Sequence, residues 1–297
     1  MREVHFSWNV KEKPEDFIVS EVSNFDLVER GNFYLYRLVK RGFNTQEVAR
    51  RFNLSYAGLK DKNAITFQYV SSPRFLGEAV FEKKNDNFFG LIFIGKIRKK
   101  VRIGNLKGNL FSVLLKGHTI SEKRWFINYY DLQRISRNTE KGKKVLQQLK
   151  EGISWKMLSW KENFYLDAYL SHLWNKAVMV LLKESYTGYY VVEKGKKFFI
   201  PETDYQDLME NFPRFFPILG YKVKLSDKEA DIYRYVLEKE EFTFEDMLCR
   251  LKQLKIKGDY RKTFLKAENI QIKNGRINFF LPKGAYATMF LKNVFIQ

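Results

Sequence analysis

The chain has few of the residues that build metal sites and disulfides. Its 297 residues include one cysteine, Cys249, and three widely separated histidines, His5, His118 and His172. A single cysteine excludes an internal disulfide framework and a thiolate zinc cluster, and scattered histidines leave little for another metal site. We therefore expect no metal centre.

Long apolar runs are also missing. No stretch approaches the roughly 18 uncharged apolar residues of a membrane-spanning helix. Residues 1–6 lack the apolar core of a signal peptide. These two absences predict a soluble, cytoplasmic protein.

The sequence further lacks the motifs of nucleotide-dependent, metal-dependent and serine hydrolase enzymes. It contains no GxxxxGK[ST], GxGxxG, HExxH or GxSxG pattern. The few histidines also give no basis for a Ser/His/Asp or Cys/His arrangement. Carboxylates among lysines remain as candidate catalytic groups.

Positive charge and aromatic rings are abundant instead. Lys and Arg number 53 against 34 Asp and Glu, a net charge of +19, and aromatic residues make up 16% of the chain. Basic residues concentrate at 96–107 and 134–150. Cationic groups bind phosphates and rings stack on exposed bases, so the composition favours a nucleic-acid partner. For each run, the alternative is a solvated surface of the Lys-rich kind found in thermophiles.

The hydrophobic pattern predicts an α+β fold of about two domains. Alternation of apolar and polar residues predicts strands at 17–22, 33–39, 65–70, 88–95 and 110–116. In the strand at 65–70 the large apolar residues are 65, 67 and 69, which suggests that one face of the strand is covered. A short helix from Thr45, a long helix at 162–184, a hairpin at 186–200 and helices from Ser226 and Thr243 follow. Strands at 268–273 and 276–281 and a terminal helix complete the chain.

This order indicates a strand-rich α+β domain interrupted by an inserted, mostly helical domain. We place the first part of the α+β domain at 1–155, the insertion at 156–262 and the second part at 263–297. The long helix at 162–184 is also compatible with packing on the α+β domain.

One segment suggests chemistry most directly. Residues 56–64 place Asp61 between Lys60 and Lys62 on a glycine-entered turn that leads into the strand at 65. Nearby ammonium groups keep a carboxylate ionised and available as a nucleophile. The same residues also make a good turn, in which an exposed acid needs no further role.

Three other segments are suggestive and have structural alternatives. Residues 11–19 mix acids and bases around Pro14, which fixes an extended approach to a strand, or they are surface charges. Residues 128–134 combine two aromatic rings, amides and a cation that suit an unstacked base, or they hold core tyrosines. Residues 281–288 form a glycine-containing turn, or simply a helix start.

In this order the segments resemble the tRNA pseudouridine synthase D (TruD) family. The matching stretches are KPEDFIVSEV at 13–22, SYAGLKDKNAITFQYVS at 55–71, GNLKGNLFSVLL at 104–115, INYYDLQR at 127–134 and LPKGAYATMFLKNVF at 281–295. Two of them resemble the family motifs NYFGxQRFG and PxGSYAT. The chain departs from the first motif at Tyr130, Asp131 and Ile135, and its middle region is shorter than in many members.

The resemblance implies a fold and a reaction. The fold is a pseudouridine synthase-type catalytic domain with a mixed or antiparallel sheet and an inserted helical domain. The reaction is the cofactor-free isomerisation of a tRNA uridine, at position 13 in the D arm, after the base has flipped out of its stack. The implied partner is tRNA, with no membrane, DNA or obligate protein partner. The alternative is a non-catalytic basic RNA-binding protein.

The resemblance also implies roles for individual residues. Asp61 stands at the nucleophile position, and both the sugar carbon and the uracil ring remain open as its target. Lys11 resembles the basic partner of that aspartate. Residues expected to hold the substrate are Phe17, Asn128, Tyr130, Gln133, Arg134, Gly284 and Tyr286, with Tyr130 as the stacking ring. Residues expected to contact the RNA backbone are Lys60, Lys62, Lys99, Lys100 and Arg102.

Overall fold

A nine-stranded mixed sheet is the largest element of the computed structural model, which describes residues 2–296. Its strand order is β16-β17-β8-β2-β5-β3-β7-β6, with β4 added beside β5. The strands are β2 (Phe17–Ser23), β3 (Phe33–Arg41), β4 (Ser55–Tyr56), β5 (Ile65–Ser72), β6 (Ala79–Lys84), β7 (Asn87–Ile97), β8 (Leu106–Leu114), β16 (Glu268–Lys273) and β17 (Arg276–Pro282). The sheet and the helices beside it confirm the predicted α+β class.

Helices and short strands make up the remainder. The helices are α1 (Thr45–Phe52), α2 (Leu132–Ile135), α3 (Thr139–Gln147), α4 (Trp160–Ser185), α5 (Tyr205–Asn211), α6 (Asp227–Glu238), α7 (Phe244–Gln253) and α8 (Ala287–Val294), with 3-10 turns η1 (Pro14–Asp16), η2 (Ile103–Asn105) and η3 (Trp155–Met157). The short strands are β1 (Glu3–His5), β9 (Thr119–Ile120), β10 (Trp125–Ile127), β11 (Gly188–Glu193), β12 (Lys196–Pro201), β13 (Phe215–Ile218), β14 (Asp259–Lys262), β15 (Phe264–Lys266) and β18 (Phe295–Ile296).

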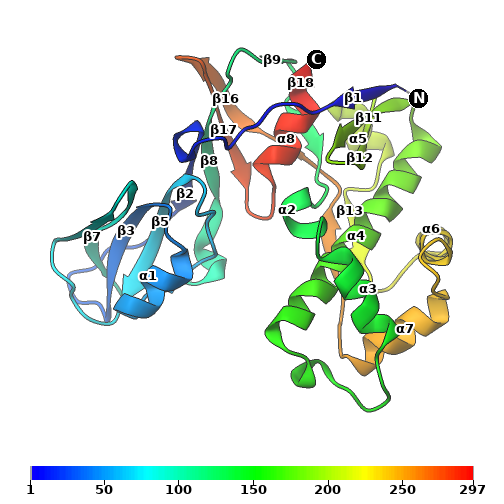
Figure 1. Ribbon diagram of the computed structural model, residues 1–297, viewed down its shortest axis with the longest axis horizontal. Helices are drawn as coiled ribbons and strands as arrows, with labels where there is room; N and C mark the ends of the chain where they lie inside the picture. The colour runs from blue at the N-terminus through cyan, green and yellow to red at the C-terminus, as the bar shows by residue number, and fades with distance from the viewer. Residues whose placement is uncertain (1, 297) are drawn as a thin grey trace.

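The helical half follows the predicted starts closely. A capping box between Ser159 and Glu162 opens α4, which runs for 26 residues as one long helix. Ser226 and Thr243 cap α6 and α7, as their spacing predicted. Figure 1 shows α3, α4, α6 and α7 gathered on one side of the molecule, the sheet with α1 on the other, and α2 and α8 between them.

The one parallel pairing in the large sheet positions the site. Strands β2 and β5 run in the same direction, with Ile18 opposite Ile65, and the other neighbouring strands of this sheet are antiparallel. Parallel strands begin at the same edge of a sheet. The segments that lead into β2 and β5 therefore lie side by side, although about 50 residues separate them.

The burial of β5 corrects the predicted alternation. The apolar residues 65, 67 and 69 are only half-buried, whereas Thr66 and Gln68 on the opposite face are fully buried. That face lies under α1 and the loop after it. Thr45 Oγ1 donates a hydrogen bond to Gln68 Oε1 (2.8 Å), and Gln68 Nε2 donates to the Gly58 carbonyl (3.4 Å). Gln68 is therefore buried with hydrogen-bond partners, as buried polar groups normally are, and the strand inverts the usual apolar-inside pattern.

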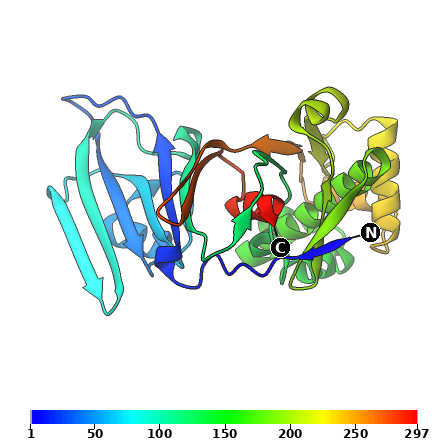
Figure 2. The same ribbon diagram turned by 90° about the horizontal axis from the view of Figure 1, so that it is seen from above.

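The main hydrophobic core joins residues from both ends of the chain. The rings of Phe6 and Phe295 lie 5.2 Å apart within it, and α4 and α8 also contribute. The N-terminal strand β1 pairs in parallel with β11 on the helical side, and Figure 2 shows this segment crossing over from the sheet. The proposed boundaries at 155 and 262 stay a prediction.

Of the helices in residues 2–296, none combines the length and the apolar composition that crossing a membrane requires.

Candidate active site

Asp61 and Lys11 form an ion pair at the edge of the sheet where β2 and β5 begin. Lys11 Nζ donates a hydrogen bond to Asp61 Oδ2 at 2.7 Å, and the two side chains are 21% and 20% exposed. The other carboxylate oxygen, Oδ1, accepts the backbone N–H of Asn63 at 2.9 Å. The carboxylate is thus held in one orientation while part of it remains accessible.

The surroundings of Asp61 keep it ionised. Burial raises its pKa, but the charge and hydrogen bond of Lys11 and the N–H of Asn63 outweigh burial, so the pKa lies below its ordinary value. The carboxylate is therefore negatively charged at neutral pH. An ionised, oriented and partly accessible carboxylate can act as a nucleophile without further activation.

A buried lysine beneath the loop supports this arrangement. Lys40, on β3, is fully buried, and its Nζ donates to the backbone carbonyls of Lys60 (3.2 Å) and Asp61 (3.1 Å). Burial lowers the pKa of Lys40 to about 8, although the nearby charge of Asp61 acts in the opposite direction. Sequence reasoning missed Lys40. Its only signal is strand alternation, which puts it on the face of buried Leu38.

Lys60 does not have the position predicted for an RNA-backbone contact. Its Nζ lies 2.8 Å from Glu21 Oε1, and the side chains are 9% and 0% exposed. Glu21 Oε2 in turn accepts the Tyr69 N–H at 2.8 Å. Because the ammonium group is enclosed and neutralised by a buried carboxylate, its position is at odds with phosphate binding. Lys62, in contrast, is exposed.

A cavity of about 180 Å³ opens beside the ion pair and collects residues from distant parts of the chain. Its lining residues are Lys11, Phe17, Val19, Leu59, Lys60, Asp61, Asn109, Phe111, Gln133, Ala285, Tyr286, Ala287 and Thr288. Lys11 Nζ lies 4.4 Å from the centre of the Phe17 ring. The fold thus brings Lys11, Phe17, Asp61, Gln133 and Tyr286 to one cavity.

Tyr130 is not among the residues that line this cavity, but it contacts one of them, Tyr286. The guanidinium of Arg261 sits 3.9 Å from the centre of the Tyr130 ring. The ring also meets Trp174 and Tyr286 edge to face, at 5.7 and 6.2 Å between ring centres. Tyr286 is therefore the aromatic ring that connects Tyr130 to the cavity.

Asn128 holds Arg261 in that place. The Asn128 side-chain oxygen accepts from Arg261 Nη2 at 2.8 Å, and its backbone carbonyl accepts from Nε at 2.9 Å. Nη2 also donates to the Gly284 carbonyl at 3.1 Å. Burial lowers the pKa of Arg261, while Tyr130 and Tyr286 act in the opposite direction. Sequence reasoning missed Arg261, because β14 carries no motif.

Arg134 is not among the residues that line the cavity, although its neighbour Gln133 is. Its guanidinium lies 3.4 Å from Asp167 and 5.2 Å from the centre of the Phe164 ring, both on α4. The substrate contact expected of Arg134 stays a prediction.

Asp131, which departs from the family motif, is buried in a network of its own. Its carboxylate accepts hydrogen bonds from the ammonium of Lys292 and the hydroxyl of Thr288. Lys292 is fully buried and also pairs with Glu193 at 2.8 Å. Burial raises the pKa of Asp131, but Lys292 and Thr288 bring it below its ordinary value. The network ties the N-terminus of α2 to the cavity-lining start of α8.

The predicted backbone contacts Lys99, Lys100 and Arg102 lie elsewhere. With Arg98 they line a second cavity of about 340 Å³, beside Phe33, Asn53, Ser55 and Pro73. The pairing of β3 with β5 shows how far this second cavity lies from Asp61. Thr66 lies opposite Lys40 near the Asp61 loop. Ser72, which precedes the cavity-lining Pro73, lies opposite Tyr34 at the other end of β5. Six residues of extended strand span about 20 Å. This basic cluster is thus remote from Asp61.

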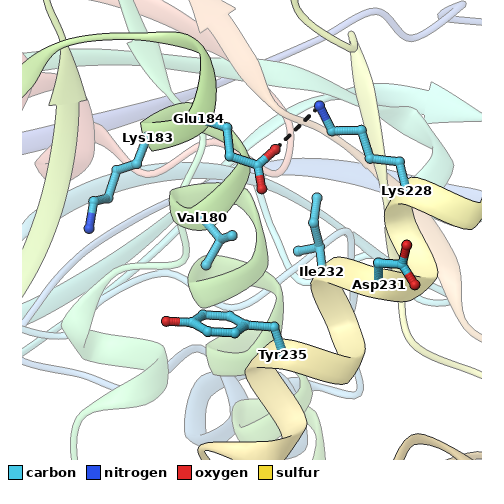
Figure 3. A pocket seen from close by; sticks show the side chains of 7 residues that line it. All are labelled: Val180, Lys183, Glu184, Lys228, Asp231, Ile232 and Tyr235. Carbon is cyan, nitrogen blue, oxygen red and sulfur yellow. Dashed lines mark ion pairs between the residues drawn. The ribbon is translucent and has the colours of Figure 1, made fainter.

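A larger cavity, of about 660 Å³, has no comparable chemistry. It lies between the end of α4 and α6 (Figure 3) and is lined by Val180, Lys183, Glu184, Lys228, Asp231, Ile232 and Tyr235. Glu184 and Lys228 pair across it at 3.3 Å. Two acids balance its two lysines, so it does not concentrate charge of one sign.

Comparisons with known proteins converge on one family. The family model described as tRNA pseudouridine synthase D (TruD) matches residues 6–159 and 130–294. A protein of Nanoarchaeum equitans described as a probable tRNA pseudouridine synthase D is 27% identical over 376 aligned positions, covering 97% of this chain and 98% of its own. The tRNA pseudouridine synthase D of Aquifex aeolicus is 26% identical over 380 positions, covering 96% and 97%.

These alignments are longer than the 297 residues of this chain, so the relatives contain segments that it lacks. A solved structure assigned to tRNA pseudouridine synthase D, from Methanosarcina mazei, has a TM-score of 0.59 at 17% identity and covers 96% of this chain and 92% of its own. That likeness shows a shared fold.

Proposed function

The chain belongs to the tRNA pseudouridine synthase D family, whose activity is the isomerisation of tRNA uridine to pseudouridine, and we propose that Asp61 is its nucleophile and uridine 13 of the D arm its target. The single observation that carries the assignment is the ion-paired carboxylate of Asp61 at the mouth of the cavity.

The reaction requires no co-reactant, because it only rearranges the bonds of one nucleotide. The bond from the sugar carbon to uracil nitrogen 1 breaks, the uracil turns, and carbon 5 bonds to the sugar. Carbon 5 loses a proton and nitrogen 1 gains one, so atoms and charge balance. Asp61 attacks either the sugar carbon or the uracil ring, and its carboxylate is released unchanged at the end.

We further propose that the target base flips out of its stack to reach Asp61. Flipping costs a few kcal/mol, which phosphate contacts and stacking on aromatic rings offset. Phe17, Phe111 and Tyr286 are the aromatic residues that line the cavity, so their rings are candidates to stack on a base there. Tyr130 would act through its contact with Tyr286, with Arg261 on one face of its ring.

Lys11 has a defined task in this scheme. When RNA fills the cavity, water leaves and the carboxylate loses solvation, which raises its pKa. An ammonium group at 2.7 Å opposes that rise and preserves the nucleophile. We propose that Lys11 acts on Asp61 in this way rather than as a phosphate contact.

The test is to incubate the protein with an unmodified tRNA transcript and to map pseudouridines by chemical labelling and primer extension. We expect modification at position 13, its loss in Asp61→Asn and unchanged tRNA affinity in that variant. Asp86→Asn is a matched control, because Asp86 also follows lysines in an exposed turn. Full activity of Asp61→Asn contradicts the nucleophile. If the unaltered protein binds tRNA but forms no pseudouridine, the result favours the alternative of a non-catalytic RNA-binding protein.

A further inference from the structure

An exposed pair of stacked aromatic rings lies at the start of α4, outside the cavity. Trp160 is 70% exposed, and its ring stacks on that of Phe164 with 5.6 Å between centres and 13° between planes. Trp155 and Met157 in the preceding turn are 45% and 65% exposed. A tryptophan this exposed contributes little to the core, and exposed apolar groups that cluster mark interaction sites.

Cations surround these rings. The Arg134 guanidinium lies 5.2 Å from the centre of the Phe164 ring, and the Lys141 ammonium lies 5.0 Å from that of the adjacent Tyr165. Lys156 and Lys161 flank Trp160 in the chain and are exposed. Stacked rings among cations are the combination that binds single-stranded nucleic acid, because rings take the bases and cations the phosphates.

The rings are also connected to the active-site cavity. Arg134 follows Gln133, which lines the cavity, and both belong to the short helix α2. Figure 1 shows α2 between the sheet and α4. A tRNA whose target base enters the cavity therefore has α2 and the start of α4 as its next surface on the helical side.

We propose that Trp160 stacks on an unpaired nucleobase of the tRNA, distinct from the base that enters the cavity. The proposal rests on the tRNA substrate of the family but not on the role of Asp61. The cations favour RNA over a protein partner, since an apolar protein surface would have to remove water from the exposed ammonium groups of Lys156 and Lys161 without compensation.

The first test measures equilibrium tRNA affinity at several salt concentrations. Trp160→Ala should weaken binding about tenfold, within the range of one base–aromatic stack, and Trp160→Phe should retain most of the affinity. The slope of log affinity against log salt should stay the same, because every cation that binds a phosphate is still present. Phe81→Ala is the matched control, as Phe81 is 68% exposed at the far edge of the sheet.

The second test observes Trp160 directly. Trp8, Trp125 and Trp174 are buried, so in a Trp155→Phe variant Trp160 is the one exposed tryptophan. Binding of tRNA should quench its fluorescence and protect it from acrylamide.

Three results overturn the proposal, and they are distinguishable. Unchanged affinity of Trp160→Ala, with Trp160 still open to acrylamide in the complex, excludes the stack alone. If the unaltered protein binds no tRNA at all, the result also contradicts the assignment of tRNA as its substrate. Loss of self-association instead of tRNA affinity, seen by light scattering, makes this surface a protein interface.

Discussion

Lys11 Nζ lies 2.7 Å from Asp61 Oδ2, although 50 positions separate the two residues. The parallel pairing of β2 with β5 makes this contact, because both residues stand just before a strand that starts at the same edge. The contact decides the chemistry of the site. Burial alone would raise the pKa of Asp61, but the neighbouring ammonium group of Lys11 brings it below its ordinary value.

Lys11→Met should therefore change the pH dependence of the reaction. In the unaltered protein the lowered pKa of Asp61 keeps the carboxylate ionised well below neutral pH. Without Lys11, burial is opposed less and the pKa rises, so the acid limb of the single-turnover rate should move to higher pH. The rate should fall more than the tRNA affinity does.

Lys62→Met is the control for this experiment, since Lys62 is exposed and adjacent to Asp61 in the chain. It should leave the acid limb where it is. If Lys11→Met weakens tRNA binding and leaves the acid limb unmoved, Lys11 is a phosphate contact.

Lys40→Met should loosen the loop that carries Asp61. It removes the donor to two backbone carbonyls, so we expect a lower single-turnover rate with little change in tRNA affinity. Stability should change with pH as well. The pKa of Lys40 is about 8 in the folded protein and about 10.4 in the unfolded chain. Between roughly pH 8 and pH 10.4 the unfolded chain therefore binds more protons, so the contribution of Lys40 to the free energy of unfolding rises with pH in this range.

Urea unfolding at pH 7 and pH 9.5 checks the second expectation. The stability difference between unaltered and Lys40→Met protein should shift in favour of the unaltered protein at the higher pH. An equal difference at both pH values contradicts the assignment of the lowered pKa to Lys40.

Asp131 and Lys292 should behave as a coupled pair in unfolding experiments. Lys292→Met leaves both Asp131 and Glu193 without their cation, and breaking a buried pair costs about 3–5 kcal/mol. Asp131→Gly, which installs the family's residue, should cost less because Lys292 keeps Glu193. The double variant should be more stable than the sum of the single effects predicts. Additivity within about 0.5 kcal/mol excludes the coupling.

The basic cluster of Lys99, Lys100 and Arg102 should contribute to tRNA affinity but not to chemistry. Replacing all three by alanine should weaken binding and make the salt slope shallower by about 0.7–0.9 for each phosphate that is no longer neutralised. The rate at saturating tRNA should stay unchanged, because the cluster is about 20 Å from Asp61 along the strands. The charge-preserving variant Lys99→Arg/Lys100→Arg/Arg102→Lys is the control. A reduced saturating rate argues against a pure backbone contact.

Local signals located five of the eight helices in residues 2–296 and missed α2, α3 and α5. Capping residues located the starts of α6 and α7, and helical spacing located α4 to within two residues at its start. These features depend on neighbours in the chain, so one sequence suffices for them. The faces of β5 were misjudged, because burial of Thr66 and Gln68 depends on α1, which contacts the strand only in the folded molecule.

The candidate site divides in the same way. The motifs identified Asp61, Lys11, Phe17, Gln133 and Tyr286, which line one cavity. No local pattern identified Lys40 or Arg261, whose partners are carbonyls and rings supplied by other elements.

The sequence by itself located the helices α1, α4, α6, α7 and α8, the long strands of the sheet and the acid with a candidate chemical role, but not α2, α3 or α5. Only the tertiary structure decided which lysine serves that acid. Lys60 and Lys62 flank Asp61 in the chain, yet Lys60 pairs with buried Glu21 and Lys62 faces solvent. Lys11 reaches the carboxylate instead. A buried charge must find a partner wherever the fold provides one, and strand pairing, not chain proximity, sets what is within reach.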